Sequence, residues 1–172
     1  GVQAQQDQIG NVGLYQTQQR RRLSTVREDQ IQQRSQSIYA ALQAELTDQW
    51  LWQGSVRFDA MQVRDVSTLA ANSGRASDQL PSLKTSLGYS LSEAWSIYAA
   101  AGQAFHSNDA RGALSQQDPT TGEALSPVPL LVRTRGSELG ARWYQTWQDD
   151  RGLNASLALW QLALDSELKY VG

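Results

Sequence analysis

The feature that most constrains the fold is an alternation of apolar and polar residues with a period of two. It recurs between polar breaks, in residues 35–46, 50–60, 82–91, 95–102, 138–144 and 153–159. In the first of these segments Ile38, Ala40 and Leu42 share one face. Successive side chains of a β-strand point to opposite faces, so this period predicts strands. We therefore expect an all-β fold, an antiparallel meander of about 6–8 strands.

The connections between these strands alternate in length. Short breaks fall at residues 47–49, 92–93 and 148–152, and long polar stretches fall at 67–79 and 106–128. Outer-membrane barrels have short turns on the periplasmic side and long loops outside, whereas a soluble β-sandwich has no reason to sort its loops in this way. The sorting favours a transmembrane β-barrel. Because an open set of six or seven strands would leave unpaired edges in lipid, we expect a partial barrel.

Most of the tryptophans lie beside the short breaks. These are Trp50, Trp52, Trp95, Trp143 and Trp147. If the short turns share one side of the membrane, the five indoles form an aromatic girdle at one interface. The alternative is that they pack in a core. Trp160 is an exception to the scheme, because it falls on the polar face of its strand.

Charged residues in the middle strands fall on the face opposite the apolar one. They are Arg57, Asp59, Lys84, Glu138 and Arg142. A Lys or Arg that faces lipid at mid-bilayer costs about 2–4 kcal/mol, so we expect all five to face a wet lumen. The solvated face of a soluble sheet would show the same distribution.

Composition narrows the classes further. Cysteine is absent, which removes disulfides, thiolate metal sites and thiol nucleophiles. The formal net charge of −2 gives no attraction to nucleic acid. Residues 1–34 are rich in Gln and Arg and predict a solvated loop, with a possible strand end at 12–18. Residues 1–10 lack the apolar segment of a signal peptide.

Two segments carry a resemblance to a known family. Residues 104–112, Ala-Phe-His-Ser-Asn-Asp-Ala-Arg-Gly, follow the strand 95–102, and residues 132–140 contain a Gly-x-Glu-x-Gly pattern. Together they resemble the C-terminal barrel half of TonB-dependent outer-membrane receptors. The resemblance covers residues 35–172, which we expect to form a partial receptor barrel. It implies that the plug domain, the TonB box and the closing strand of the family are absent from this chain.

The resemblance also implies a function. Such a receptor lies in the outer membrane of a Gram-negative bacterium and imports a scarce solute, with iron–siderophore complexes as the default class. Its partners would be outer-membrane lipid, a small-molecule ligand such as a siderophore, and the TonB complex through the plug and TonB box. A passive porin or small structural barrel, and a soluble all-β binding domain, remain as alternatives. We expect no enzymatic activity, no cofactor and no nucleic-acid partner.

The segment that carries the resemblance also contains the candidate ligand residues, His106, Asn108, Asp109 and Arg111. They suit contact with a charged ligand at the extracellular rim. The alternative is a local role, in which Asn108 and Asp109 form turns and Asp109 pairs with Arg111 to order the loop. His106 is the only histidine, and a lone histidine without a second ligand makes a poor metal site. We predict no metal-binding or catalytic residues.

Overall fold

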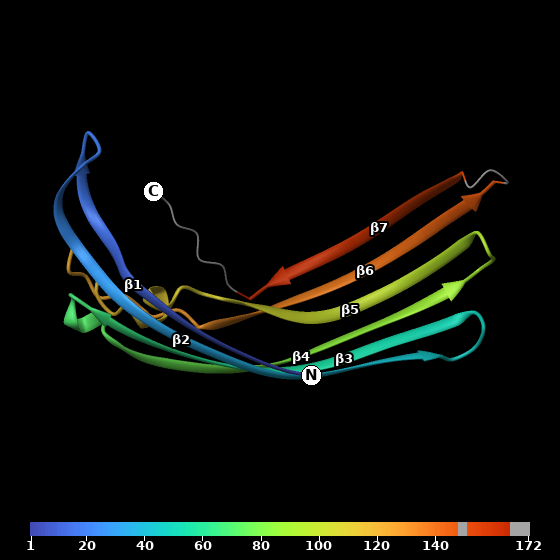
Figure 1. The fold of residues 1–172 in the computed structure, drawn as a ribbon, viewed down its shortest axis with the longest axis horizontal. Coiled ribbons are helices and arrows are strands. Elements are labelled where there is room, and N and C mark those ends of the chain that lie inside the picture. Colours follow the sequence, from blue (N-terminus) through green and yellow to red (C-terminus); the bar gives the residue numbers. More distant parts are fainter. Residues whose placement is uncertain (148–150, 166–172) are drawn as a thin grey trace.

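The computed structural model describes residues 1–147 and 151–165. Within them, one antiparallel sheet contains seven strands in chain order, each paired with the next. The strands are β1 (Val2–Gln18), β2 (Arg21–Glu45), β3 (Trp50–Ser67), β4 (Gly74–Ser90), β5 (Trp95–Ser107), β6 (Leu131–Thr146) and β7 (Gly152–Leu164). The sheet curves into a half-barrel (Figure 1). The predicted all-β meander and partial barrel are confirmed.

The alternation of the sequence gives the sheet two chemically different faces. On the convex outer face, large apolar side chains stand exposed, for example Ile38 at 59%, Leu139 at 63% and Leu159 at 73%. The concave inner face carries the polar residues of the same strands, such as Arg57 opposite Ser82. Water would disfavour so much exposed apolar surface, whereas lipid accommodates it.

The β2–β3 and β4–β5 connections lie at the same end of the sheet (Figure 1). The same kind of backbone bond occurs at these connections and between β6 and β7: Leu46 N to Trp50 O at 2.9 Å, Leu91 N to Trp95 O at 2.9 Å, and Trp147 N to Arg151 O at 2.8 Å. The predicted turns at 47–49 and 92–93 are confirmed. Residues 148–150 of the third lie outside the described residues.

Residues 1–34 do not form the solvated loop that their composition predicts. They are mostly strand, β1 and the first part of β2, joined by Gln19 and Arg20 with φ of 50° and 66°. Two successive positive φ angles are those of a tight hairpin turn. The prediction was wrong because both faces of this hairpin are polar, so backbone pairing forms strands that no hydrophobic period marks. The strand end expected at 12–18 lies within β1.

Both long loops are shorter or more ordered than predicted. β3 continues to Ser67 and β4 begins at Gly74, so only residues 68–73, with the 3-10 helix η1 (Ala70–Asn72), connect them. The second connection runs from 108 to 130 and contains the helix α1 (Ala110–Leu114). Polar residues at 74–79 belong to a wall that extends beyond the apolar band, which is why polarity suggested a loop.

The connection 108–130 folds back onto the inner face of the sheet. Its helix α1 contributes to a buried apolar cluster with residues of β2, β3 and β4. Among residues 1–147 and 151–165, no helix has the length and apolarity needed to cross a membrane.

Candidate functional site

The inner face of the wall brings together all five residues expected to face the lumen. The strand pairing shows this for two of them. Lys84 lies opposite Gly102 on β5, and Glu138 lies opposite Ala100, which is two residues from Gly102 on the same strand. Alternate residues of a strand share a face. The same reasoning along β3, β4 and β6 places the whole set on the inner face: Arg57, Asp59, Lys84, Glu138 and Arg142.

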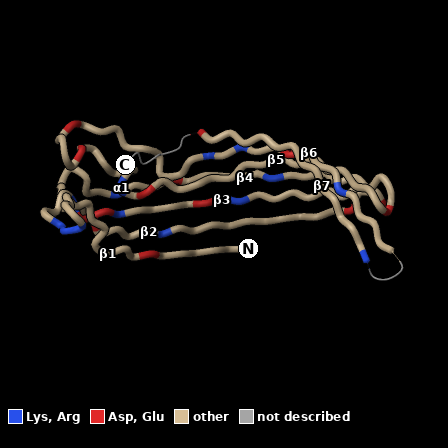
Figure 2. The backbone as a smooth tube through the Cα atoms, turned by 90° about the horizontal axis from the view of Figure 1, so that it is seen from above, with Lys and Arg blue, Asp and Glu red and all other residues tan. Residues whose placement is uncertain are grey.

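Arg57 and Asp59 form an ion pair that ties three strands together. The Arg57 Nε atom donates to both carboxylate oxygens of Asp59 at 2.9 Å. One terminal nitrogen of Arg57 donates to Ser37 Oγ on β2 at 2.8 Å and to Gln3 Oε1 on β1 at 3.3 Å. Figure 2 shows that basic and acidic residues follow one another along β3. The arrangement makes Arg57 a structural part of the inner wall.

Glu138 and Arg142 both contact Tyr98 on the neighbouring strand β5. The Tyr98 hydroxyl donates a short hydrogen bond to Glu138 Oε1. The Arg142 guanidinium carbon lies 4.8 Å from the centroid of the Tyr98 ring. A cation over the face of an aromatic ring is attracted by its quadrupole. The two charges are therefore linked through an aromatic residue that sequence reasoning did not single out.

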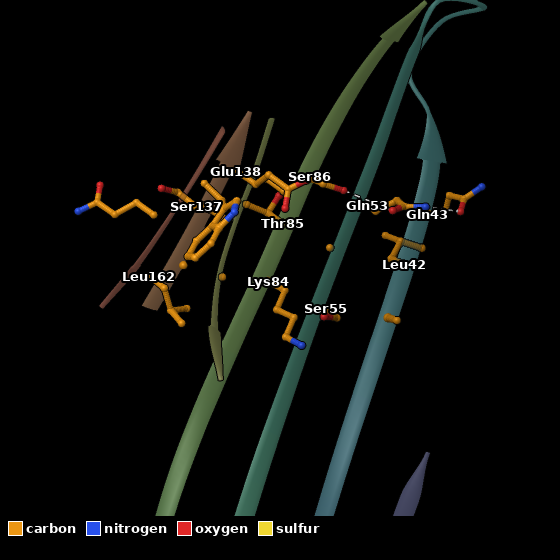
Figure 3. A pocket seen from close by; sticks show the side chains of 18 residues that line it. Leu42, Gln43, Gln53, Ser55, Lys84, Thr85, Ser86, Ser137, Glu138 and Leu162 are labelled. Atoms are coloured by element: carbon orange, nitrogen blue, oxygen red, sulfur yellow. Dashed lines mark hydrogen bonds between the residues drawn. The ribbon is translucent and has the colours of Figure 1, made fainter. Parts of the chain in front are cut away.

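Lys84 lies on the inner face at the level of Ser55, next to a row of polar side chains (Figure 3). In that row, Ser86 Oγ donates to Gln53 Oε1 at 3.3 Å, and Gln53 Nε2 donates to Gln43 Oε1 at 2.8 Å. Lys84 itself makes no ion pair with any residue that the structure describes. The Lys84 ammonium, without an ion-pair partner among the described residues, therefore lies beside a row of hydrogen-bonded amides and hydroxyls.

Four of the five girdle tryptophans lie on the outer face near the short turns. Trp50 contacts Tyr89 with ring centroids 4.5 Å apart, and Trp95 contacts Trp143 at 6.3 Å. Trp52 is two residues from Trp50 and shares its face. These pairs bridge β3 to β4 and β5 to β6, so the aromatic residues form a row across adjacent strands.

The two remaining tryptophans differ from that row. Trp147 follows the end of β6 and is exposed at 52%. Trp160 lies opposite Glu138 on the inner face, as its place in the alternation predicts.

The rim candidates Asn108, Asp109 and Arg111 order the start of the long connection. Asn108 Nδ2 donates to Pro129 O at 2.7 Å, which joins the two ends of the connection. Asp109 accepts from the backbone N–H of Arg111 at 2.8 Å and pairs with its guanidinium at 2.6 Å. The Arg111 guanidinium holds the pKa of the Asp109 carboxyl below its usual value. These contacts are those of the local role, in which the three residues order the loop.

His106 lies at the end of β5, opposite Val132 on β6, and is half-buried. Its side chain has no hydrogen bond to any residue in the described part of the chain, so it does not order the loop in that way. Within the same residues, no group of three or more His, Cys, Asp or Glu side chains is placed to hold a metal ion.

A family model described as TonB dependent receptor-like, beta-barrel matches residues 2–172. The chain belongs to the TonB-dependent receptor β-barrel family. No curated protein sequence matches it. Barrels of this family are the outer-membrane part of transport receptors. The apolar face of such a barrel lies toward lipid and its polar face toward the lumen, which accounts for the two faces of this sheet.

Three residues of the receptor that sequence reasoning missed bond to the long connection or to the start of β6 that follows it. Asn72 is fully buried; its Oδ1 accepts from the N–H groups of Gln116 and Gln117 at 2.9 and 3.0 Å, and its Nδ2 donates to Gln117 O at 2.9 Å. Asp78 Oδ2 accepts from Leu131 N at 3.1 Å. The third, Arg27, donates to Ser115 in the connection.

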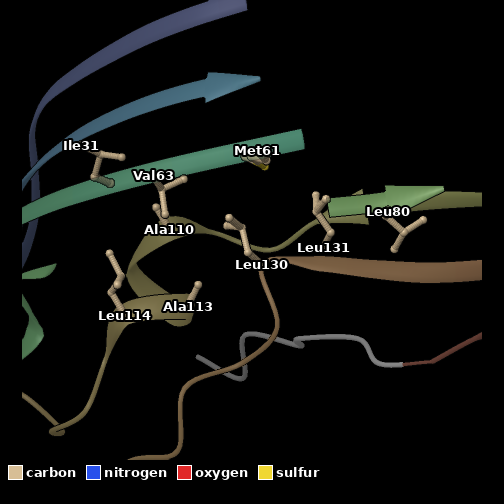
Figure 4. Packing of buried hydrophobic residues seen from close by; sticks show 9 residues of the cluster. All are labelled: Ile31, Met61, Val63, Leu80, Ala110, Ala113, Leu114, Leu130 and Leu131. Atoms are coloured by element: carbon tan, nitrogen blue, oxygen red, sulfur yellow. The ribbon is translucent and has the colours of Figure 1, made fainter. Parts of the chain in front are cut away.

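An apolar cluster completes the attachment of this receptor loop (Figure 4). Ala113 and Leu114 of α1 pack toward Ile31 of β2 and Val63 of β3. Burying such side chains stabilises a contact by roughly 1.5–3 kcal/mol for each large one. The loop is therefore a packed element of the rim.

One sequence signal of the receptor turns was also missed. The turn sequences Leu46-Thr-Asp-Gln-Trp50 and Leu91-Ser-Glu-Ala-Trp95 share the pattern Leu-(Ser/Thr)-(Asp/Glu)-x-Trp. In each, the hydroxyl accepts from the tryptophan N–H at 3.2 Å. The repeat would have located both turns and the girdle together.

Proposed function

We propose that this chain forms wall and outward-facing loops of a receptor in the cell outer membrane of a Gram-negative bacterium, which takes up a scarce solute by TonB-dependent transport. The observation that carries the proposal is the division of the curved sheet into an apolar outer face and a polar inner face, in a chain of this family. An iron–siderophore complex is the solute class that we propose.

The proposed orientation puts the short turns in the periplasm. A transmembrane strand needs about 9–11 residues, so β3 would cross between Trp50 and approximately Ala60. The tryptophan row would then lie at the periplasmic interface, where indoles favour the headgroup level. The connections 68–73 and 108–130 and the hairpin tip at 19–20 would lie outside the cell.

In this orientation the inner-face charges border the solute path or the plug. Lys84 is the sharpest candidate, because its ammonium has no ion-pair partner among the described residues. We infer that an anionic group, on the solute or on the plug, meets it during transport. Force from the TonB complex would reach the barrel through the plug and TonB box rather than through these strands.

Deletion of the gene tests the solute class. We expect the deletion strain to lose growth on one ferric siderophore supplied as the only iron source, and to lose uptake of its radiolabelled iron to the extent seen in a strain without TonB. Growth equal to wild type on a broad panel of ferric siderophores would argue against this class. Uptake that persists without TonB would favour a passive porin.

Complementation tests the inner-wall assignment in the same strain. Lys84→Gln removes the ammonium, and we expect slower uptake at an unchanged level of folded receptor. The matched control is Leu83→Ile, a change on the outer face one residue away, which should leave uptake as in wild type. A water-soluble, monomeric and cooperatively melting product made without detergent would reject the membrane assignment altogether.

A further inference from the structure

Three charged side chains lie buried beneath the connection 108–130. Arg27 on β2 donates through Nε to Asp29 at 2.7 Å and through a terminal nitrogen to Asp65 on β3 at 3.2 Å. The residues are 6%, 2% and 1% exposed. A charge is rarely buried to this extent unless it is paired. The three side chains therefore form a single electrostatic unit, called here the buried triad.

The buried triad carries more negative than positive charge when both carboxyls are ionised. One guanidinium faces two carboxylates, and Asp65 Oδ1 has no hydrogen-bond partner among the described residues. Arg111 of α1 is the cation that faces Asp65 from the helix, and it is itself paired with Asp109. On the β4 side, Gly74 lies opposite Asp65 and brings no charge.

The connection 108–130 covers the buried triad and is bonded to it. Arg27 donates through its other terminal nitrogen to Ser115 Oγ at 2.8 Å, and Ser115 lies directly after α1. The helix packs against β2, β3 and β4 around these residues. Movement of the connection away from the wall would expose Asp65 to water and break the bond to Ser115.

We propose that the buried triad latches the connection 108–130 onto the inner wall, and that the latch holds more tightly at mildly acidic pH than at neutral pH. The inference does not depend on which solute is taken up, because it rests on the wall and the loop alone.

The direction follows from the ionisation of Asp65. Burial raises the pKa of Asp65 to about 6, and the neighbouring Asp29 carboxylate adds to this, while Arg27 and Arg111 act against it. Asp65 lies five residues beyond Ala60, outside the span proposed for the membrane. In the undocked loop the carboxyl returns toward its usual pKa of 3.8. The docked state therefore binds the proton more tightly.

Proton linkage gives the direction and the size of the change in the docking equilibrium with pH. A carboxyl whose pKa is raised on docking favours docking fully below pH 3.8, and this gain is lost as the pH rises through about 6. Between pH 7 and pH 5 the docking equilibrium should shift by about 10-fold toward the docked loop. At neutral pH the Asp65 carboxyl is ionised, and its buried charge makes the docked state of the loop less favourable.

Hydrogen exchange in the complete receptor, purified in detergent from the outer membrane, measures this equilibrium. The informative amides are those of Gln116 and Gln117, whose N–H groups are bonded to Asn72 in the docked loop. After correction for the intrinsic pH dependence with an unstructured reference peptide, we expect about 10-fold greater protection at pH 5 than at pH 7. Equal protection at the two pH values would overturn the proposal.

Two variants assign the effect. Asp65→Asn keeps the shape and removes the titration, so protection should become the same at both pH values. Asp78→Asn is the matched control, because it weakens a carboxylate contact with Leu131 at the start of β6 but leaves the buried triad intact, so the 10-fold ratio should remain. A ratio that survives in Asp65→Asn would overturn the assignment to this carboxyl. A heat-modifiable electrophoretic shift confirms that each variant barrel is folded.

Discussion

The ring of Tyr98 on β5 lies over Gly140 on β6, in the space that a side chain at position 140 would fill. The Tyr98 hydroxyl donates to Glu138, and the Arg142 guanidinium lies over the Tyr98 ring. Gly140 therefore lies between two charged residues that both contact this ring. An aromatic residue that covers a glycine on the neighbouring strand restores packing which the glycine lacks. The contact joins two strands of the wall.

Replacement of Gly140 by Ala should therefore destabilise the wall. The added Cβ would overlap the Tyr98 ring, and forced overpacking costs about 1–3 kcal/mol. Equilibrium unfolding in urea, with the receptor in lipid vesicles, measures the loss. Gly88→Ala is the control, since its Cβ would meet nothing closer than Leu51 O at 3.8 Å. Equal effects of the two changes would show that the ring does not occupy the space above Gly140.

The hydroxyls of the turns β2–β3 and β4–β5 should contribute measurably to stability. Thr47 Oγ1 accepts from the N–H groups of Gln49 and Trp50, both at 3.2 Å. Thr47→Ala removes these bonds and should cost about 0.5–1.5 kcal/mol, while Thr47→Ser retains them. The same urea unfolding detects the difference, with Asp48→Ala as a neighbouring surface control. A loss of stability in Thr47→Ser as large as in Thr47→Ala would exclude the hydroxyl as the cause.

The tryptophan row should lie in contact with lipid, and Trp160 should not. Single-tryptophan receptors, with the other indoles changed to Phe, can be placed in vesicles containing brominated lipids. Strong quenching is expected for Trp50, Trp95 and Trp143 on the outer face. Trp160 on the inner face provides the internal control and should be quenched weakly. Quenching of Trp160 equal to the others would contradict the assignment of the two faces.

Asn72 should protect the connection 108–130 against proteases. Asn72→Ala leaves the N–H groups of Gln116 and Gln117 without their acceptor, at a cost of about 1–3 kcal/mol. If local opening limits cleavage, a glutamate-specific protease should cut after Glu123 roughly 5- to 150-fold faster. Ser73→Ala, which affects only the adjacent contact with Ser67, should change the rate little. Unchanged cleavage of Asn72→Ala would show that this side chain does not anchor the loop.

Sequence reasoning succeeded where residues alternate between lipid and water. The strand around Ile38, the turns before Trp50 and Trp95, and the inner-face position of Lys84 all followed from the period of two. It failed where both faces of a strand are polar. Residues 1–34 show no alternation of apolar and polar residues. Their hairpin is therefore recognised only from the backbone pairing of β1 with β2 and of β2 with β3.

The loop was the second failure, for a different reason. Its composition is that of a solvated loop, and Asn108 and Asp109 were recognised only as candidate ligand residues or turn formers. Nothing local indicated that Ala113 and Leu114 would pack on the wall or that Asn72 would bind Gln117. These contacts join distant segments, and a loop sequence does not specify the surface that it will meet.

The sequence by itself determined the strand segments in which apolar and polar residues alternate, their two faces and the side on which the tryptophans lie. These features depend only on a residue and its neighbours two positions away, because alternate side chains of a strand face the same environment. Only the tertiary structure decided that Arg27 would bond to Asp65 and Ser115, at separations of 38 and 88 residues. Arg27 meets Asp65 because β2 and β3 pair, and it meets Ser115 because the connection 108–130 folds onto the inner face, which no local period encodes.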